Sequence, residues 1–457
     1  MPPILINVAA FVVAILVLVT VHELGHFWVA RRLGIKVRRF SVGFGPPIYT
    51  WRRRGDDTEY VLAALPLGGY VKMLDEREEE EPIPPADLPF AFNRAPVWKR
   101  SLVVLAGPVA NFLLAVLIYW GLLLGGETGM RPEVGSVEPD SIAAEAGFTP
   151  GDVVTGVDGR SVATWGNLWF ALLSASLGGD DVRVGVATAD GDVAVRTLPA
   201  DALARLDPGP GFLTEVGLDR YSPSIPPVIG DVVPDEPAAA AGLESGDRVL
   251  FIDGKPVADW DDLVAAVHAR ARQTVPVLVE RDGVEQTLQL TPRALTLEDG
   301  SVVGRIGAGP AVPEGLYDDV MVDVHYGPVE ALQEAARRVG DLSVMTLRIL
   351  WRMLVGTASV QNLSSPIGIA DAAGKTASFG VAPYLEFLAL LSVSLGLLNL
   401  LPIPILDGGH LLYFAVEALL RRPLSEEIQA QGQRLGLLLI ISLMTLAFYV
   451  DIARIFG

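Results

Sequence analysis

The side chains of this sequence that could do chemistry stand close together near its beginning. His22-Glu23-Leu24-Gly25-His26 fits the pattern H-E-x-x-H. Residues four apart lie on one face of a helix, so both imidazoles can reach one metal ion while Glu23 lies beside it. Zinc lowers the pKa of a water molecule to about 7, and a nearby carboxylate can take up the proton. The motif predicts metal-assisted hydrolysis, with His22 and His26 as ligands and Glu23 as general base.

The motif stands in an apolar stretch, residues 4–30, which is long enough to cross a bilayer because about 20 residues suffice. An ionisable residue at the bilayer centre costs about 2.5–3.5 kcal/mol on insertion scales, so three of them within five positions require a compensating centre such as a metal ion. Two surface histidines and a glutamate are the non-functional alternative, which suits a soluble helix better. A cleavable signal peptide is the other alternative, but the stretch lacks a charged start and a small-residue cleavage site.

Two histidines leave a catalytic zinc ion one protein ligand short. Asp407 is the candidate, because the prolines and glycines of residues 402–409 break the helix around it. Non-helical backbone at membrane depth is buried in protein or lines a cavity. Three alternatives stay open: Asp407 as a structural hydrogen-bond acceptor, His410 as a competing ligand, and another divalent metal in place of zinc.

Composition narrows the possible functions. The 457 residues are 51% hydrophobic and 19% charged, which indicates a mixture of membrane and soluble parts. The formal charge of −19 argues against nucleic-acid binding, because phosphates would be repelled. There are no cysteines, so disulfides, thiolate catalysis and cysteine-ligated zinc are excluded.

Hydropathy predicts four membrane crossings: residues 4–30, 102–124, 384–420 with an interruption at 402–409, and 435–450. Residues 31–100 hold 13 lysines and arginines, whereas the much longer stretch 126–380 holds 18. Because positively charged loops stay in the cytoplasm, we expect residues 31–100 inside and the long middle section outside.

The middle of the chain contains a repeat with a constant offset of 95 residues. The offset pairs Pro139-Asp140 with Pro234-Asp235, Ala146-Gly147 with Ala241-Gly242, Gly151-Asp152 with Gly246-Asp247, Asp158-Gly159 with Asp253-Gly254, and Trp165 with Trp260. Each copy indicates a small domain of strands, two helices and hairpin turns.

The phrases AAEAGFTPGDVVTGVDGRSV and AAAAGLESGDRVLFIDGKPV resemble tandem PDZ domains of the circularly permuted bacterial kind. We place these domains at residues 127–223 and 224–312. PDZ domains accept extended peptides, often by their terminal carboxylate, beside a strand and a helix. We expect the grooves to begin at residues 134–137 and 229–232. A steric screen or spacer without a ligand is the alternative for each.

The combination of an H-E-x-x-H helix, PDZ-like repeats and a later L-D-G motif resembles the site-2 protease family of intramembrane zinc metalloproteases. The similarity covers essentially the whole chain and is greatest to the bacterial regulator-of-sigma-E branch. It implies one Zn²⁺ per chain, held by His22, His26 and Asp407, with Glu23 as the catalytic glutamate.

Further positions follow from the same resemblance. Asn399 and Pro402 match an N-x-x-P motif that helps to hold the substrate backbone. LPLGGYVKML, with Gly68, Gly69 and Tyr70, resembles a membrane-reentrant β-hairpin that offers an edge strand to the substrate. Asn111 matches a G-P-x-x-N motif in the second span, where we expect only a packing or polar-lining role.

We therefore expect a polytopic α-helical membrane protein with a reentrant β-hairpin and two extracytoplasmic α+β PDZ domains. Its parts are residues 1–126 (membrane part with the first motif), the two PDZ domains, 313–380 (amphipathic helix and linker) and 381–457 (membrane part with Asp407). The resemblance implies regulated intramembrane proteolysis in the bacterial inner membrane, on single-pass substrates such as anti-sigma factors already cut outside by another protease. Two other functions stay open: an inactive membrane scaffold presenting PDZ domains, and a zinc peptidase of signal-peptide remnants.

Overall fold

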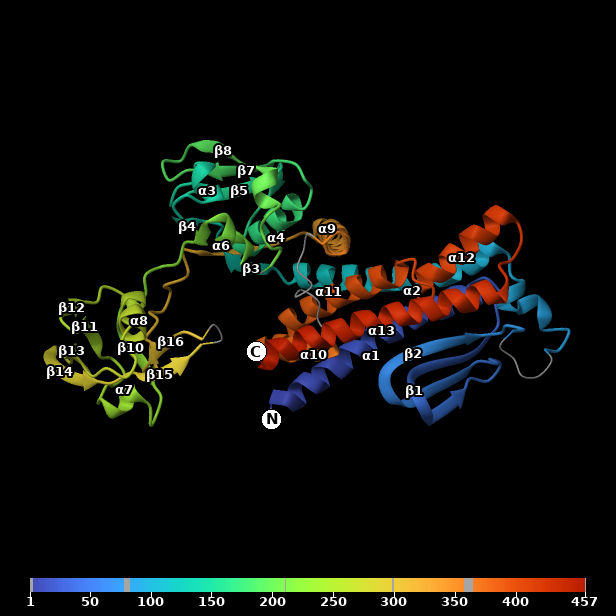
Figure 1. Ribbon diagram of the computed structural model, residues 1–457, viewed down its shortest axis with the longest axis horizontal. Coiled ribbons are helices and arrows are strands. Elements are labelled where there is room, and N and C mark those ends of the chain that lie inside the picture. The colour runs from blue at the N-terminus through green and yellow to red at the C-terminus, as the bar shows by residue number, and fades with distance from the viewer. Residues whose placement is uncertain (1–2, 78–82, 210, 298–299, 357–364, 457) are drawn as a thin grey trace. The chain divides into compact units, whose positions relative to one another are not determined.

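The computed structural model describes residues 3–77, 83–209, 211–297, 300–356 and 365–456, which form two compact units (Figure 1). The first unit combines the two ends of the chain, up to residue 127 and from residue 324 onward. The second unit is the middle of the chain, residues 128–323.

Four helices of the described residues in the first unit are long and apolar enough to cross a membrane: α1 (Pro3–Arg32), α2 (Val97–Leu124), α11 (Val381–Leu400) and α13 (Glu426–Phe456). This confirms the expected multi-pass membrane protein. Helix α2 starts five residues before the expected span, because the helix begins with the charged residues Lys99 and Arg100 that a hydropathy window excludes. Helix α13 likewise extends the fourth span at both ends.

The other elements of this unit are α9 (Pro328–Leu354), α10 (Pro366–Phe379), α12 (Asp407–Leu420), strands β1 (Val37–Arg52) and β2 (Glu59–Met73), and two 3₁₀ turns, η1 (Leu88–Phe90) and η2 (Phe92–Arg94). The sequence predicts an amphipathic helix and a linker over residues 313–380. Helix α9 matches the expected amphipathic helix, but α10 occupies part of the expected linker and packs against α1. Residues 357–364 of that stretch lie outside the described residues.

Helix α2 lies at the centre of the first unit and contacts α1, α9, α11 and α12. Helix α1 approaches it closely at Gly25, where a Cβ would lie 2.8 Å from the Cβ of Ala110. On the other side, Gly396 of α11 lies against Pro108, where a Cβ would be 3.2 Å from the carbonyl oxygen. Small residues allow such close approach between helices in a membrane. The arrangement puts the His22–His26 face of α1 directly against α2.

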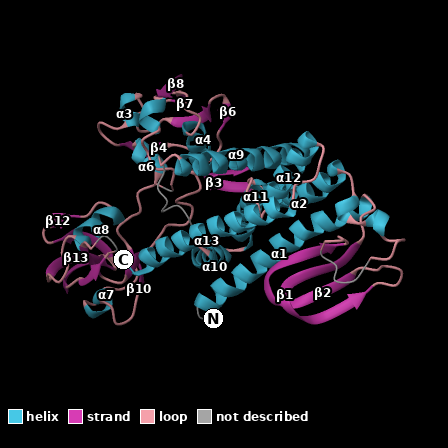
Figure 2. Ribbon diagram, turned by 45° about the vertical axis from the view of Figure 1, so that its right-hand side comes forward, coloured by secondary structure: helices cyan, strands magenta, loops and turns pink. Residues whose placement is uncertain are grey.

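Strands β1 and β2 form a sheet that runs alongside α1 (Figure 2). Each strand bends and pairs with the other twice, so that Phe40 faces both Val71 and Tyr60. The four segments lie in the order 69–73, 37–42, 59–62 and 47–52. Gly43 (φ 92°) and Gly68 (φ 156°) take backbone angles that favour glycine where the strands bend. The expected hairpin is therefore only part of a larger sheet. Because β1 and β2 each bend once, the two strands form four paired segments.

Segment 69–73 is an edge of this sheet, since the pairing of the described residues joins it only to residues 37–42. Helix α1 contacts β2, and a Cβ on Gly69 of this segment would lie 3.3 Å from side-chain atoms of Val19 and Glu23. An edge strand presents unpaired N–H and C=O groups that can pair with another extended chain.

The second unit repeats one set of elements at the 95-residue offset. Strands β4 (Val134–Val137) and β10 (Ile229–Val232), helices α3 (Ile142–Glu145) and α7 (Pro237–Ala240), and strands β5 (Val153–Val157) and β11 (Arg248–Ile252) correspond in this way. Strands β6 (Arg160–Ser161) and β12 (Lys255–Pro256) and the first residues of helices α4 (Trp165–Ser176) and α8 (Trp260–His268) follow the same spacing. Turn residues Asp158 (φ 50°) and Asp253 (φ 53°) also share a left-handed backbone conformation.

Each half of this unit has a four-stranded antiparallel sheet and a separate strand pair. The sheets have the orders β6-β5-β7-β8 and β12-β11-β13-β14, and the pairs are β4-β9 and β10-β17. The remaining elements are β3 (Glu127–Met130), β7 (Val182–Ala187), β8 (Val193–Leu198), α5 (Ala200–Leu203), α6 (Phe212–Val216), β9 (Leu218–Arg220), β13 (Val275–Arg281), β14 (Val284–Leu290), β15 (Arg293–Thr296), β16 (Val302–Arg305), β17 (Ala308–Pro310) and β18 (Met321–Val324).

The glycine segments expected to begin the peptide grooves are themselves paired strands. A Cβ on Gly135 would lie 2.7 Å from the Cα of Tyr221, just after β9, and one on Gly230 would lie 2.7 Å from the carbonyl carbon of Pro310 in β17. In the second half a surface groove lies along α8, between Trp260 and His268, and Asp231 of the expected segment lines it together with residues of β16 and β17. The glycines mark close strand pairing, which sequence spacing alone did not distinguish from an open loop.

Candidate active site

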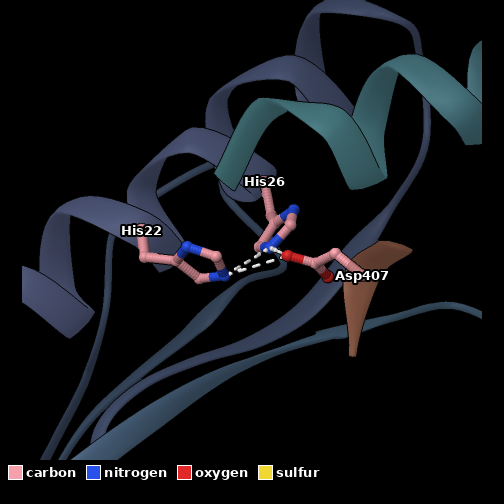
Figure 3. Close-up of side chains that lie close together, drawn as sticks. All are labelled: His22, His26 and Asp407. Carbon is pink, nitrogen blue, oxygen red and sulfur yellow. Dashed lines mark hydrogen bonds and ion pairs between the residues drawn. The ribbon is translucent and has the colours of Figure 1, made fainter. Parts of the chain in front are cut away.

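The side chains of His22, His26 and Asp407 meet at one point between α1 and the first residue of α12 (Figure 3). The Nε2 atoms of His22 and His26 lie 3.2 Å and 3.5 Å from Oδ2 of Asp407. The two Nε2 atoms are 3.1 Å apart. Both histidines are buried, with 7% and 8% of their surface exposed. Residues that are far apart in the sequence thus lie as close together as the ligands of one metal ion.

These three atoms fit a zinc ion. Bonds of about 2.0–2.1 Å in a tetrahedron put neighbouring ligand atoms about 3.3 Å apart, close to the three separations observed. Oδ2 of Asp407 is buried and makes no well-formed hydrogen bond with any described residue. A buried carboxylate oxygen in this position needs a cation or a hydrogen-bond donor beside it. Two imidazoles and one carboxylate, with a fourth position open, form the donor set of a catalytic zinc site.

Helix α2 supplies a partner to His26. The Nδ1–H group of His26 donates a hydrogen bond of 2.8 Å to the carbonyl oxygen of Val103. This bond fixes the proton on Nδ1 and leaves the Nε2 lone pair directed at the centre. Asn111, one of the predicted polar residues, is fully buried, with its side-chain amide 3.2 Å from Nδ1 of His22.

Asp407 is positioned by the break between α11 and α12. Backbone bonds from Leu401 N–H to Leu398, from Ile403 N–H to Leu401 and from Leu406 N–H to Ile403 satisfy this non-helical stretch. Gly408 and Gly409 begin α12 so close to the preceding turn that a Cβ on either would overlap its backbone. The glycines therefore allow the chain to turn sharply and present Asp407 at the start of the helix.

Glu23 lies between the histidines on α1 and faces the edge segment of the sheet. A Cβ on Gly69 would lie 3.3 Å from Cγ of Glu23 and 2.7 Å from the carbonyl oxygen of Ser41. The backbone of Val71 is within hydrogen-bonding reach of the Glu23 carboxylate. Gly68 packs under the ring of Phe44, which stacks on Tyr70 at a centroid distance of 6.3 Å. The predicted glycines thus bring the edge segment to the general-base candidate.

A cavity of about 1110 Å³ joins these groups, and its walls come from α1, β2, α2, α12 and α13. His22, Glu23, His26, Asp407 and Tyr70 all line it. His410 lines the cavity too, but the described ligand atoms that lie within 4.8 Å of one another are those of His22, His26 and Asp407.

Two predicted residues lie elsewhere. Asn399 is partly buried near the end of α11, and Pro402 is exposed in the break that follows. Neither belongs to the described residues that line the cavity. The structure therefore does not bring these two residues together with the metal ligands.

Sequence reasoning missed an ion pair in the cavity wall. Arg100 of α2 binds Glu417 of α12 and also donates to the carbonyl oxygen of Ala95 at 2.9 Å. Its guanidinium lies 4.8 Å from the ring centroid of Phe414. The signal was present, because Glu417 is an isolated charge in the apolar residues 410–420 and needed a partner.

Comparison with known proteins agrees with this site. The profile of Peptidase family M50 matches residues 10–443. The chain is 40% identical to the regulator of sigma-E protease RseP of Escherichia coli K12, over 98% of this chain and 99% of that protein. It is 41% identical to the regulator of sigma E protease of Salmonella typhi, over 99% of both. A Vibrio cholerae protein with zinc metalloprotease in its name is 40% identical over the full length of both. The chain therefore belongs to peptidase family M50, the site-2 type of intramembrane zinc metalloproteases.

Proposed function

We propose that this zinc metalloprotease cuts the transmembrane segments of single-pass proteins of the anti-sigma-factor type, after another protease has shortened them outside the membrane. Relatives with about 40% identity over their whole length are named regulators of sigma E. The observation that carries the proposal is one cavity lined by the three metal-ligand residues, by Glu23 and by residues of the edge segment 69–73.

Each site residue has a role in this proposal. His22, His26 and Asp407 hold one Zn²⁺, which supplies a Lewis acid and lowers the pKa of a water molecule. Glu23 takes the proton from the attacking water and later delivers it to the leaving amine. The buried imidazoles of His22 and His26 keep their orientation between turnovers.

Segment 69–73 holds the substrate. A peptide bond in an intact helix has its backbone groups tied up, so the substrate must unwind before water can attack. Pairing with the sheet edge satisfies the N–H and C=O groups that unwinding releases. Gly69 keeps this strand close to Glu23, and Tyr70 forms part of the wall beside it. The family resemblance assigns Asn399 and Pro402, in and after α11, to holding the substrate backbone, although neither is among the described residues that line the cavity.

The second unit contains two PDZ domains, at about residues 127–223 and 224–312. They lie outside the bacterial inner membrane, while residues 31–100 lie in the cytoplasm, because the lysines and arginines concentrate in that shorter stretch. The PDZ pair admits shortened substrates, either by binding their new termini or by excluding bulky outer domains.

One substitution tests the enzyme activity. Glu23→Gln removes the base and leaves the ligand atoms in place, so cleavage of a membrane-anchored reporter falls to background while the protein level is unchanged. Glu427→Gln, an exposed carboxylate of α13 outside the cavity, is the matched control and keeps full cleavage. Cleavage by the Glu23 variant would contradict the proposed chemistry.

Metal analysis tests the centre independently. The purified wild-type chain carries about one zinc ion per molecule, and a variant with both His22 and His26 replaced by alanine carries none. Equal zinc in the two proteins would refute this centre. A wild-type chain with zinc but without cleavage of any reporter would favour an inactive scaffold.

A further inference from the structure

We propose that Asn111 is the positioning residue that fixes the tautomer of His22, so that helix α2 orients both histidine ligands. The inference rests on the metal site of the proposed function. It assigns a specific role to a residue for which the sequence suggested only packing or polar lining.

Helices α1 and α2 meet in register at the two histidines. His22 and His26 lie four residues apart on α1, and Val103, Gly107 and Asn111 lie at the same spacing on α2. The carbonyl of Val103 accepts from His26, and the amide of Asn111 lies 3.2 Å from Nδ1 of His22. A Cβ on Gly107 would lie 2.6 Å from Cε1 of His26 and 2.8 Å from Cε1 of His22. About two turns of α2, from Val103 to Asn111, therefore line the single turn of α1 that carries both imidazoles.

The next step is the protonation of His22. Its Nε2 atom is the one that approaches Asp407 and the Nε2 of His26, so Nε2 must offer its lone pair to a metal. A neutral imidazole then carries its proton on Nδ1, which becomes a donor. The group that faces Nδ1 must accept a hydrogen bond from this N–H, as the Val103 carbonyl does from His26.

Asn111 provides such an acceptor when its amide is oriented correctly. The assigned orientation directs Nδ2 at His22 and leaves Oδ1 buried without a hydrogen-bond partner among the described residues. The oxygen and nitrogen of an amide are nearly the same in shape, and their assignment follows from the hydrogen-bond network. Turning the amide places Oδ1 on the Nδ1–H of His22, where it accepts a hydrogen bond as the Val103 carbonyl does from His26. Residue Asn111 itself is fixed, because Ser392 donates to its carbonyl at 2.8 Å.

The variants distinguish orientation from packing. Asn111→Leu keeps the volume and removes the acceptor, whereas Asn111→Asp keeps an acceptor oxygen. Removing a group that hydrogen-bonds to a metal-bound histidine typically lowers metal affinity by about 10–100-fold. We expect Asn111→Leu to weaken zinc binding by about that factor and Asn111→Asp to restore most of it. Ser394→Ala on α11, which removes a hydroxyl that donates to the carbonyl oxygen of Leu390 in the same helix, leaves zinc affinity unchanged.

Zinc affinity is measured by competition with a chromogenic chelator, on full-length protein in detergent, without any substrate. Equal affinity of wild type and Asn111→Leu would overturn the inference, and so would equal losses in the Leu and Asp variants. If wild type holds no zinc at all, the proposed metal site fails instead, so the two failures are distinguishable.

A second measurement needs no variant at residue 111 and decides the matter even if Asn111→Leu does not fold. The chain has only five histidines, so ¹⁵N-histidine labelling gives few signals, and His22→Gln identifies that of His22. In zinc-free wild type at a pH where the ring is neutral, we expect the Nδ1–H tautomer. The Nε2–H tautomer would mean that Asn111 donates to His22, which would overturn the proposal.

Discussion

Arg100 and Glu417 form a two-point ion pair that joins α2 to α12, with Nη2–Oε1 and Nη1–Oε2 distances of 2.7 Å and 3.1 Å. Their side chains are only 10% and 17% exposed. Helix α12 carries Asp407 at its first residue, and α2 carries the hydrogen-bond partners of the histidines. The pair therefore connects the element that holds the third ligand with the element that orients the other two.

Breaking this pair should destabilise the membrane unit. Arg100→Met leaves the Glu417 carboxylate in the cavity wall without its partner, and removing one member of a buried pair costs about 3 kcal/mol. The double variant Arg100→Met/Glu417→Met should recover much of this loss, because no charge is stranded. Denaturant titration in mixed micelles measures the free energy of unfolding. A double variant that is less stable than Arg100→Met would contradict the expectation.

Gly69→Ala should lower the cleavage rate much more than stability. The added Cβ would lie 2.7 Å from the Ser41 carbonyl and 3.3 Å from Glu23, so the edge segment must shift away from the general base. A displacement of this size near reacting groups can cost on the order of 100-fold in rate. Gly121→Ala on α2 is the control, because nothing lies within 4 Å of its Cβ position. Reporter cleavage and the thermal midpoint measure the two effects, and full activity of Gly69→Ala would argue against this placement of the strand.

Substrate helicity should control the rate. If the substrate pairs with the edge segment, a reporter whose transmembrane segment is rich in leucine unwinds less readily and is cut more slowly than one with glycine or proline in the middle. The two reporters should share their flanking sequences and accumulate equally. Equal cleavage of both would indicate that the enzyme accepts helical substrate, or that its substrates are peptides already extended.

The second unit should lose stability in acid through Asp247. Burial alone would raise the pKa of the Asp247 carboxyl, but Arg281 at 2.6 Å and the backbone N–H of Glu244 outweigh it and hold the pKa below its ordinary value. The folded state thus favours the charged form, and the gain is complete above the ordinary pKa of 3.8. We expect protection of the β11–β13 amides in the full chain, corrected for intrinsic exchange, to fall as the pH drops below about 5.

Arg281→Met checks the cause of this pH dependence. Without the guanidinium of Arg281, the buried Asp247 carboxylate loses the cation that stabilises its charged form. Protection of the β11–β13 amides at pH 7 therefore decreases, and its pH dependence flattens or reverses. Arg248→Met, an exposed arginine on β11, serves as the control and should behave as wild type. Unchanged protection of the wild-type chain down to pH 3.5 would exclude Asp247 as the titrating group.

The sequence predicted the parts of the site that obey local rules. Helical spacing put His22 and His26 on one face, and the Pro/Gly break identified Asp407 as an unusual acid at membrane depth. It did not predict the two bends of the β1–β2 sheet, because several glycines can equally form one turn of a hairpin. Nor did it predict the Arg100–Glu417 pair or the hydrogen bond from His26 to the carbonyl of Val103. These contacts depend on the rotation of α2 against its neighbours, which no single segment encodes.

The placement of Asp407 also has a consequence for biosynthesis. The two imidazoles leave the ribosome before the carboxylate that completes the triad, because Asp407 follows His26 by 381 residues. At typical rates of translation, on the order of half a minute separates the two events. A nascent chain that has not reached Asp407 therefore lacks one of the three ligands, so a protease that works among other membrane helices cannot assemble its centre before that residue is made.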